Sequence, residues 1–188
     1  MTEDKSQAIE EAFCPPESGA PPSALRTVLS ELFRLLVKIA AIALIVLALF
    51  TFMFGIYRST ENAMHPMVKD GDLIVFYRLD KSYTASDVVV IEHNGELQTR
   101  RVIAVAGDRV DITENGLMIN GAYVQEPNIF EKTHRYEAGT EFPLVVGENQ
   151  VFVLGDSREH AQDSRIYGCI DKDDICGTVL LILRRRGI

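Results

Sequence analysis

The strongest hydrophobic pattern in the chain is an uninterrupted apolar run near its N-terminal end. Residues 39–57 carry no charged side chain and are almost wholly apolar, and residues 35–37 extend the run upstream. About 20 such residues in a helix span the hydrocarbon core of a bilayer. The pattern predicts a single transmembrane anchor over residues 34–57. A cleaved signal peptide has a shorter apolar region, and a buried core helix is seldom apolar all round over this length.

The residues before this run predict a tail and an orientation. Arg26, Arg34 and Lys38 lie on the N-terminal side of the run, against Arg58 alone in the immediate C-terminal flank. Because Lys and Arg favour the cytoplasmic flank of a membrane helix, the N-terminus is expected in the cytoplasm and the C-terminal domain outside the cell membrane. The run 14–23 is rich in Pro and small polar residues, so residues 1–33 are interpreted as a disordered cytoplasmic tail.

After the anchor, short β-branched runs alternate with turn signals. Asn94-Gly95 and Asn120-Gly121 carry the dipeptide that favours tight hairpins. No long helical period interrupts the alternation, so a mainly β domain is expected over residues 58–188. The predicted strands are residues 73–76, 88–91, 102–105, 117–119, 151–154 and 179–183.

Composition excludes several classes of function. The net charge is −8 and no basic stripe with interleaved aromatic residues occurs, which argues against nucleic acid as a partner. The His residues lack ligand spacing, and neither a Cys-x-x-Cys pair nor a glycine-rich phosphate loop is present, so no metal and no cofactor are expected. Cys169 and Cys176 both fall in the domain expected outside the cytoplasm, where disulfides form. They are candidates for a structural disulfide with each other. The terminal run 184–186, three arginines, is a candidate contact for anionic lipid headgroups, with a solvated end as the alternative.

Four motifs follow one another after the anchor. They are Asn62-Ala63-Met64-His65-Pro66, then residues 71–78, 101–108 and 155–158, the last continuing at 163–168. In these motifs, their order and their spacing, the chain resembles signal peptidase I, a family of membrane-anchored endopeptidases that cleave signal peptides with a Ser/Lys dyad. The resemblance covers most of residues 60–180. It implies a β-barrel-like fold whose site lies beside the membrane surface.

The residues that the resemblance assigns to catalysis are replaced. The nucleophile position holds Ala63 and the general-base position holds Arg100; the oxyanion-hole serine matches Glu61, and the serine that orients the base matches Ala161. A methyl group is no nucleophile, and a guanidinium has no acceptor lone pair. A carboxylate also repels a developing oxyanion. These four changes predict a degenerate site that does not cleave, although an engineered Ser→Ala change at position 63 stays open.

The remaining motif residues are expected to serve structure and binding. The family binds its substrate as an extended strand, which implies a groove at or near Met64, Pro66, Met67 and Val68. The sequence shows no nucleophile–base spacing that would rescue catalysis. The candidate bases are His65, His93 and His160, and the candidate nucleophiles are Ser59, Thr60 and Ser164. The charged positions near the site are expected to pair with one another and to hold its loops: Arg101, Asp156, Arg158, Asp163 and Arg165.

The sequence thus favours a membrane-anchored, non-cleaving relative of signal peptidase I. By this hypothesis it binds an exported or pilin-like polypeptide and assists its assembly, for example in pilus biogenesis with a sortase system. The first alternative is an active signal peptidase I seen as a mutant. The second is a regulatory subunit that occupies a true signal peptidase or its substrates.

Overall fold

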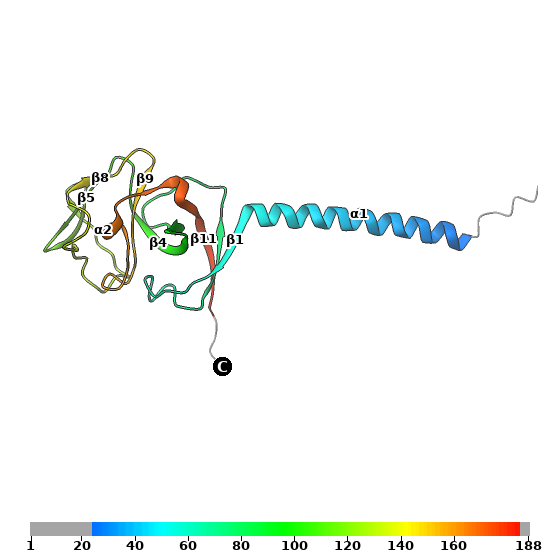
Figure 1. Ribbon diagram of the computed structural model, residues 1–188, viewed down its shortest axis with the longest axis horizontal. Helices are drawn as coiled ribbons and strands as arrows, with labels where there is room; N and C mark the ends of the chain where they lie inside the picture. The colour runs from blue at the N-terminus through cyan, green and yellow to red at the C-terminus, as the bar shows by residue number, and fades with distance from the viewer. Residues whose placement is uncertain (1–23, 185–188) are drawn as a thin grey trace, which may run out of the picture. The chain divides into compact units, whose positions relative to one another are not determined.

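The computed structural model describes residues 24–184, which form two compact units divided between Leu47 and Ala48. Helix α1 (Ala24–Met53) supplies the first unit and enters the second, which contains every strand (Figure 1). By length and composition α1 is able to cross a membrane. Residues 1–23 of the predicted tail lie outside the described residues.

The bounds of the predicted anchor are wrong at both ends. The helix already begins at Ala24, so residues 24–33 are helical and not a disordered tail. It ends at Met53, and the next residues form strand β1 (Phe54–Arg58), whose backbone pairs antiparallel with strand β2 (Leu73–Tyr77). Apolarity continues across this boundary, because the helix and the strand both use apolar side chains. Pairing with β2 ends the helix, and this pairing leaves no signal in the apolar run itself.

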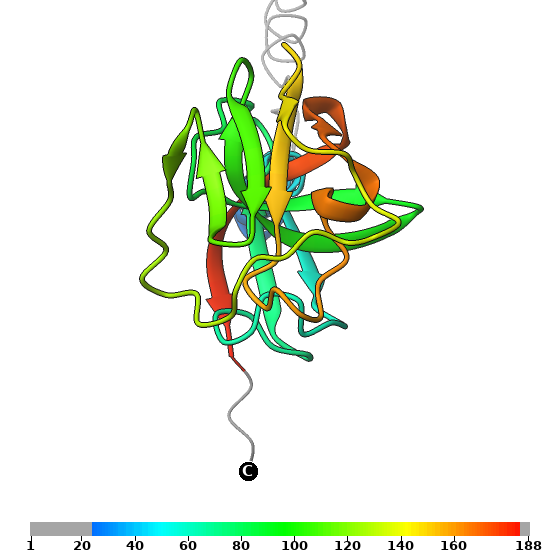
Figure 2. The ribbon, with the colours of Figure 1, turned by 90° about the vertical axis from the view of Figure 1, so that its left-hand side faces the viewer.

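The strands form two antiparallel sheets. The first sheet is ordered β1, β2, β11 (Ile175–Leu183), β3 (Val88–His93), β4 (Glu96–Val105), β9 (Gln150–Leu154) and β10 (Ile170–Asp171). The second is ordered β7 (Ala122–Tyr123), β6 (Gly116–Ile119), β5 (Arg109–Thr113) and β8 (Leu144–Val145). A short helix α2 (Ser164–Tyr167) lies beside β9 (Figure 2), and a 3-10 helix η1 (Lys172–Asp174) precedes β11.

The mainly β prediction is confirmed, but within residues 24–184 neither sheet closes into the expected barrel. All six predicted strands are present, as β2, β3, part of β4, β6, β9 and part of β11. The two Asn-Gly turns join β3 to β4 and β6 to β7, and both residues of each turn have positive φ, as this tight hairpin requires.

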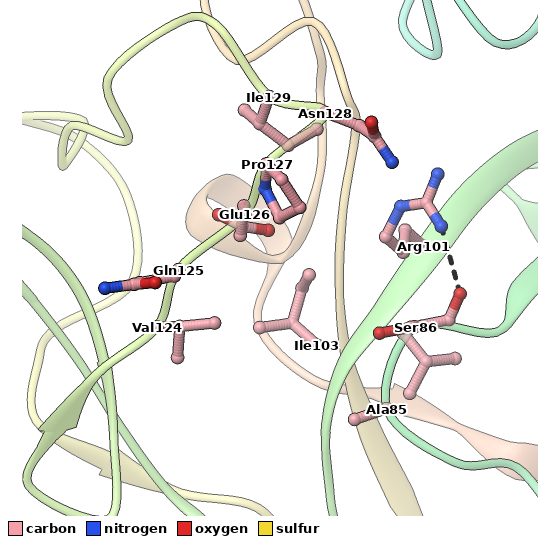
Figure 3. A pocket seen from close by; sticks show the side chains of 11 residues that line it. Ala85, Ser86, Arg101, Ile103, Val124, Gln125, Glu126, Pro127, Asn128 and Ile129 are labelled. Carbon is pink, nitrogen blue, oxygen red and sulfur yellow. Dashed lines mark hydrogen bonds between the residues drawn. The ribbon is translucent and has the colours of Figure 1, made fainter.

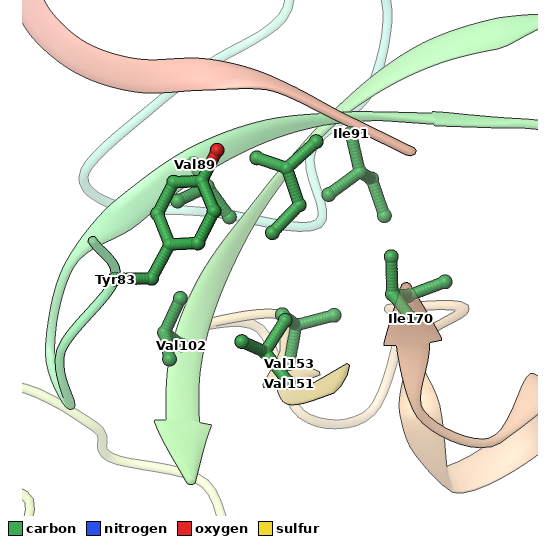
Figure 4. Close-up of a cluster of buried hydrophobic side chains, with 8 residues drawn as sticks. Tyr83, Val89, Ile91, Val102, Val151, Val153 and Ile170 are labelled. Atoms are coloured by element: carbon green, nitrogen blue, oxygen red, sulfur yellow. The ribbon is translucent and has the colours of Figure 1, made fainter. Parts of the chain in front are cut away.

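The first sheet is buried on both faces in its centre. Alternate residues of β3 enter different hydrophobic clusters: Val89 and Ile91 pack with Tyr83 in one (Figure 4), while Val88 and Val90 pack in another. In β9, Val151 and Val153 join the first of these clusters, and Phe152 and Leu154 join a third cluster against the second sheet. Burial on two faces explains why these strands read as continuous apolar runs.

The predicted disulfide is absent. Cys169 and Cys176 are both free, and each is about half-buried. Cys169 packs against the cluster that contains Phe152, whereas Cys176 packs against the cluster that contains Met64. The two thiols therefore serve different parts of the core, where each acts as a small apolar side chain.

The buried phenol of Tyr83 has no hydrogen-bond partner among the described residues. Burial, followed by the charge of Asp80, raises the pKa of Tyr83 to about 12. A raised phenol pKa favours folding below the unfolded value near 10, and this contribution is lost as the pH rises through about 12. At pH 7 we expect the free energy of unfolding of Tyr83→Phe to equal that of the wild type or to be higher by up to about 1 kcal/mol, because the substitution removes a buried hydroxyl without a partner. Above pH 10 this variant should lose less stability than the wild type. Urea unfolding at pH 7 and at a pH above 10 measures both effects.

The exposed Tyr123 supplies the matched control. Tyr123→Phe removes a phenol that is not buried, so the alkaline loss of stability should persist in this variant. An equal alkaline loss in Tyr83→Phe and Tyr123→Phe would contradict the assignment of this loss to the Tyr83 phenol.

Candidate functional site

The segment between β1 and β2 holds position 63 in a folded turn. Ser59 and Gly71 close the segment at its base, with the amide of Ser59 donating to the carbonyl of Asp72 at 2.9 Å and the amide of Gly71 donating to the carbonyl of Ser59 at 2.8 Å. Inside the turn, Met64 is buried in the core cluster with Phe76. Ala63 is 4% exposed, so its methyl group also faces the interior of the domain.

Ala63 packs against the loop that follows β9. Its carbonyl accepts a hydrogen bond of 2.9 Å from the amide of Ser157. Gly155 lies so close that a Cβ atom there would stand 2.6 Å from the Ala63 carbonyl oxygen and 2.3 Å from the Cβ of Ala161. Only glycine permits this approach, and the result is a tight contact of three small residues at positions 63, 155 and 161.

The guanidinium of Arg100, on β4, is fully buried and pairs with Glu61. The two ends of the guanidinium donate to the two carboxylate oxygens at 2.5 and 3.1 Å, which is the bidentate geometry of a strong ion pair. The Glu61 side chain is 30% exposed. The side chains at the predicted base position and the predicted oxyanion position thus bind each other.

Every N–H of the Arg100 guanidinium has an acceptor. Besides Glu61, it donates to the carbonyls of Gln162 at 2.9 Å and Thr99 at 2.6 Å, and to the side-chain oxygen of Gln98 at 2.9 Å. Burial by itself lowers the pKa of Arg100, but the hydrogen bonds and charge of Glu61 outweigh it and raise this pKa above its ordinary value. Arg100 is therefore a permanent cation with no lone pair to accept a proton.

A second contact links the same two segments. The phenol of Tyr57, on β1, hydrogen bonds to the hydroxyl of Thr99, on β4. Burial raises the pKa of Tyr57 to about 12, so the phenol stays protonated at neutral pH. Tyr57 and Glu61 together fix the segment that leads to Ala63 against neighbouring residues of β4.

The charged residues of the motifs form bidentate ion pairs around this centre. Arg101 pairs with Asp156 at 2.6 Å, and Arg165 pairs with Asp163 at 2.9 Å. Arg158 differs from the expectation: it pairs with Glu126 at 2.5 Å. Glu126 lies in a segment without a motif, so nothing in the sequence marked it as a partner.

These pairs hold the loop at Gly155. The carboxylate of Asp163 accepts from the amide of Gly155 at 3.0 Å and caps helix α2. Arg158 donates to the Gly155 carbonyl at 2.9 Å, and Arg165 donates to the Arg158 carbonyl at 2.7 Å. Through Gly155, this network fixes the packing surface of Ala63.

Comparison with known proteins decides the family. A family model described as signal peptidase, peptidase S26, matches residues 32–184. Signal peptidase I of Bacillus licheniformis is 33% identical over 153 residues, which are 74% of this chain and 82% of that protein. The chain belongs to the signal peptidase I family. Signal peptidase IB of Staphylococcus aureus is 30% identical over 79% of this chain and 87% of that protein.

A solved signal peptidase I from Enterococcus faecalis is a looser match. It is 24% identical, with a TM-score of 0.45 over 53% of this chain and 97% of that one.

The predicted groove residues divide into two pairs. Met64 and Val68 are each 1% exposed and belong to a core cluster, so the expectation that they line a surface is wrong. Pro66 and Met67 are exposed, and Met67 accepts from Arg101 through its sulfur. Residues 64–68 form a helix-like turn, in which the amide of Val68 donates to the carbonyl of Met64. Residues four positions apart lie on the same side of such a turn, so Met64 and Val68 face the core while residues 66 and 67 lie outside.

The candidate replacement catalysts remain scattered. His65 is exposed, and His93 stacks on Tyr167 with ring centroids 4.2 Å apart. The hydroxyl of Ser164 accepts from the amide of Val153 at 3.0 Å, which is the structural role expected for it. Ser59 donates to the Glu61 carbonyl at 3.2 Å, and Thr60 is exposed.

His160 contacts Ser157, a residue of the motif at 155–158. Its Nδ1 lies 3.3 Å from the hydroxyl oxygen of Ser157, and a carboxylate oxygen of Glu131 lies 3.5 Å from the same hydroxyl. The carboxylate thus competes for the serine and does not orient the imidazole, which is not the order of a catalytic triad. Within residues 24–184 no three His, Cys, Asp or Glu residues are grouped to bind a metal.

The Arg100–Glu61 pair predicts strong thermodynamic coupling. Glu61→Ala leaves a buried guanidinium without its counter-charge, and we expect a loss of about 3 kcal/mol in free energy of unfolding. Removing both charges, as Arg100→Met with Glu61→Leu, should recover most of this loss because no unpaired ion remains buried. Urea unfolding of the two single variants and the double variant measures the coupling.

The exposed pair Arg34 and Glu31 on helix α1 is the control, since it should contribute well under 1 kcal/mol. Additive losses at positions 61 and 100 would contradict the interpretation of these residues as one unit.

Proposed function

We propose that this chain is a non-cleaving member of the signal peptidase I family that binds exported polypeptides at the cell membrane and assists their assembly, for example in pilus biogenesis. The observation that carries the proposal is the buried Arg100–Glu61 ion pair. It occupies the positions at which the family resemblance places the general base and an oxyanion-hole serine. In this site the charged side chains of Arg100 and Glu61 bind each other and not a reacting peptide.

For each chemical step of Ser/Lys proteolysis, the side chain that the step needs is missing from this site. Attack on a peptide carbonyl needs a hydroxyl, and Ala63 has a methyl group. Proton transfer needs a neutral amine, and the guanidinium of Arg100 stays charged with all its N–H groups bonded. The carboxylate of Glu61 opposes the negative charge that develops on the substrate oxygen.

The scaffold around the site is nevertheless complete. Bidentate ion pairs at Asp156 and Asp163 and the close contact at Gly155 keep the loops beside Ala63 in one conformation. Such order is useful for holding a polypeptide even where none is cut. The partners that we propose are therefore an exported or pilin-like polypeptide, membrane lipid and a sortase system.

The second candidate function is cleavage of signal peptides by this protein in a form with serine at position 63. The relatives that match most of the chain are signal peptidases I, which favours this alternative. It requires Arg100 to be replaced or bypassed as well. The two candidates differ in one measurable property, which is turnover of a signal-peptide substrate.

We expect no cleavage of a signal-peptide substrate by the purified protein, and none after Ala63→Ser alone. A lysine introduced at position 100 would face the Glu61 carboxylate, which favours its charged form. Measurable cleavage therefore requires Ala63→Ser, Arg100→Lys, Ala161→Ser and Glu61→Ser together. A fluorogenic signal-peptide substrate in detergent micelles measures turnover of each variant.

The control is the variant that carries Arg100→Lys, Ala161→Ser and Glu61→Ser but keeps Ala63, because it has the restored base without a nucleophile. Full activity in Ala63→Ser alone would overturn the proposal and favour an engineered form of an active peptidase.

We also propose that the N-terminus lies in the cytoplasm and the β domain outside it. Arg26, Arg34 and Lys38 flank the apolar part of α1 on one side, against Arg58 on the other. Protease added to spheroplasts should then degrade the domain after Arg58 and spare an epitope placed before Arg26. Protection of the domain until the membrane is permeabilised would reverse the orientation.

A further inference from the structure

A cleft lies beside the degenerate site, made of two adjoining hollows. One has a volume of about 260 Å³ and is lined by Arg101, Ile103 and residues 124–129, among others. The other has a volume of about 230 Å³ and is lined by His65, Pro66, Asn128, Phe130, Glu131 and Asp156. The hollows share Asn128, and Arg101, which lines one of them, forms an ion pair with Asp156, which lines the other. We refer to them together as the Asn128 cleft.

One wall of the cleft is the loop of residues 124–131, which turns at Pro127 and Asn128. Figure 3 shows the loop facing Arg101 and Ile103 of β4, with the Asn128 side chain directed toward Arg101. The amide of Val124 donates to Leu117 and that of Ile129 donates to Glu126. The amides of Gln125 and Asn128 have no partner among residues 24–184. Free main-chain groups along a cleft are what an extended peptide pairs with.

The loop also presents an aromatic side chain to solvent. Phe130 is 86% exposed, the highest exposed fraction among the large apolar residues described. Val124, Pro127 and Ile129 add apolar surface along the same wall. Aromatic side chains of this kind contribute much of the affinity when a partner buries them.

The charges of the cleft are not balanced. Arg101 is paired with Asp156, and Glu126 is paired with Arg158. Glu131 has no cationic partner within the described part of the chain; its carboxylate accepts only from the Glu159 amide at 2.9 Å and the Ser157 hydroxyl at 3.5 Å. The unpaired carboxylate of Glu131 complements a cationic side chain.

We propose that the Asn128 cleft binds an extended segment of polypeptide that carries a large apolar side chain, placed against Phe130, and a Lys or Arg placed beside Glu131. This inference rests on the proposed function only in taking the polypeptide to be an exported one. The cleft would make this chain a selective binder of such segments. Its binding residues lie outside the core positions Met64 and Val68.

Anisotropy with three fluorescein-labelled decapeptides of Ala and Ser tests the proposal on the full chain in micelles. The first carries Phe and Lys two residues apart, the second Phe and Glu, and the third Ala and Lys. We expect the first peptide to bind about fivefold more tightly than the second, the size of one exposed ion pair, and about tenfold more tightly than the third.

Two variants locate the binding. Phe130→Ser should weaken binding of the Phe/Lys peptide about tenfold, and Glu131→Gln should abolish the preference for Lys over Glu. Val145→Ser is the control, since Val145 is 65% exposed on β8 and does not line the cleft. Equal affinity of Phe130→Ser and Val145→Ser, equal binding of the Lys and Glu peptides, or no saturable binding would overturn the inference.

The cleavage assay separates this inference from the proposed function. Turnover by the unmodified protein refutes the proposed function whatever the peptides do. Absence of turnover together with unchanged binding in Phe130→Ser refutes the Asn128 cleft alone. Because the Phe130 ring lies in solvent, Phe130→Ser should unfold at the same temperature as the wild type. An unchanged unfolding temperature shows that this variant loses binding without losing its fold.

Discussion

The cost of burying a charged guanidinium is the constraint on which the rest of the domain depends. Arg100, Arg158 and Arg165 are among the largest fully buried side chains. An unpaired ion in such a place costs several kcal/mol, so each guanidinium requires a carboxylate from a particular segment. Glu61, Glu126 and Asp163 meet this requirement, and they bring the segment after β1, the loop 124–131 and the start of α2 together around Ala63.

The Arg100–Glu61 pair makes each of these two residues depend on the other. An arginine alone at position 100 would be a buried cation without a partner, and a glutamate alone at position 61 would lose its bidentate donor. Together they satisfy the guanidinium, with Gln98, Thr99 and Gln162 accepting the remaining N–H groups.

The Arg158–Glu126 pair connects this core to the surface. It fixes one residue of the loop that forms a wall of the Asn128 cleft, while neighbouring residues of the loop keep unpaired amides and an exposed aromatic ring. A loop held firmly at one point loses little conformational entropy when it binds a partner. The loop 124–131 therefore contains both a residue fixed by a buried ion pair, Glu126, and the exposed side chain of Phe130.

The sequence by itself determined the family, the apolar helix and most of the β pattern. These features depend on side chains within a few residues of each other: the apolar run of β2, the Asn-Gly turns after His93 and Ile119, and the motif around Gly155. The chemistry of Ala63 and Arg100 could also be predicted from single positions, because a methyl group is no nucleophile and a guanidinium is no base.

Only the tertiary structure decided how the residues of the site meet. Glu61 and Arg100 are 39 positions apart, and Glu126 lies 32 positions from Arg158 in a stretch with no motif, so no local pattern joins them. The end of α1 at Met53 depends on pairing with β2, and the separation of Cys169 from Cys176 depends on which cluster each one enters. Long-range pairing follows from the need to satisfy buried charges and backbone groups, and that need arises only once the chain has folded.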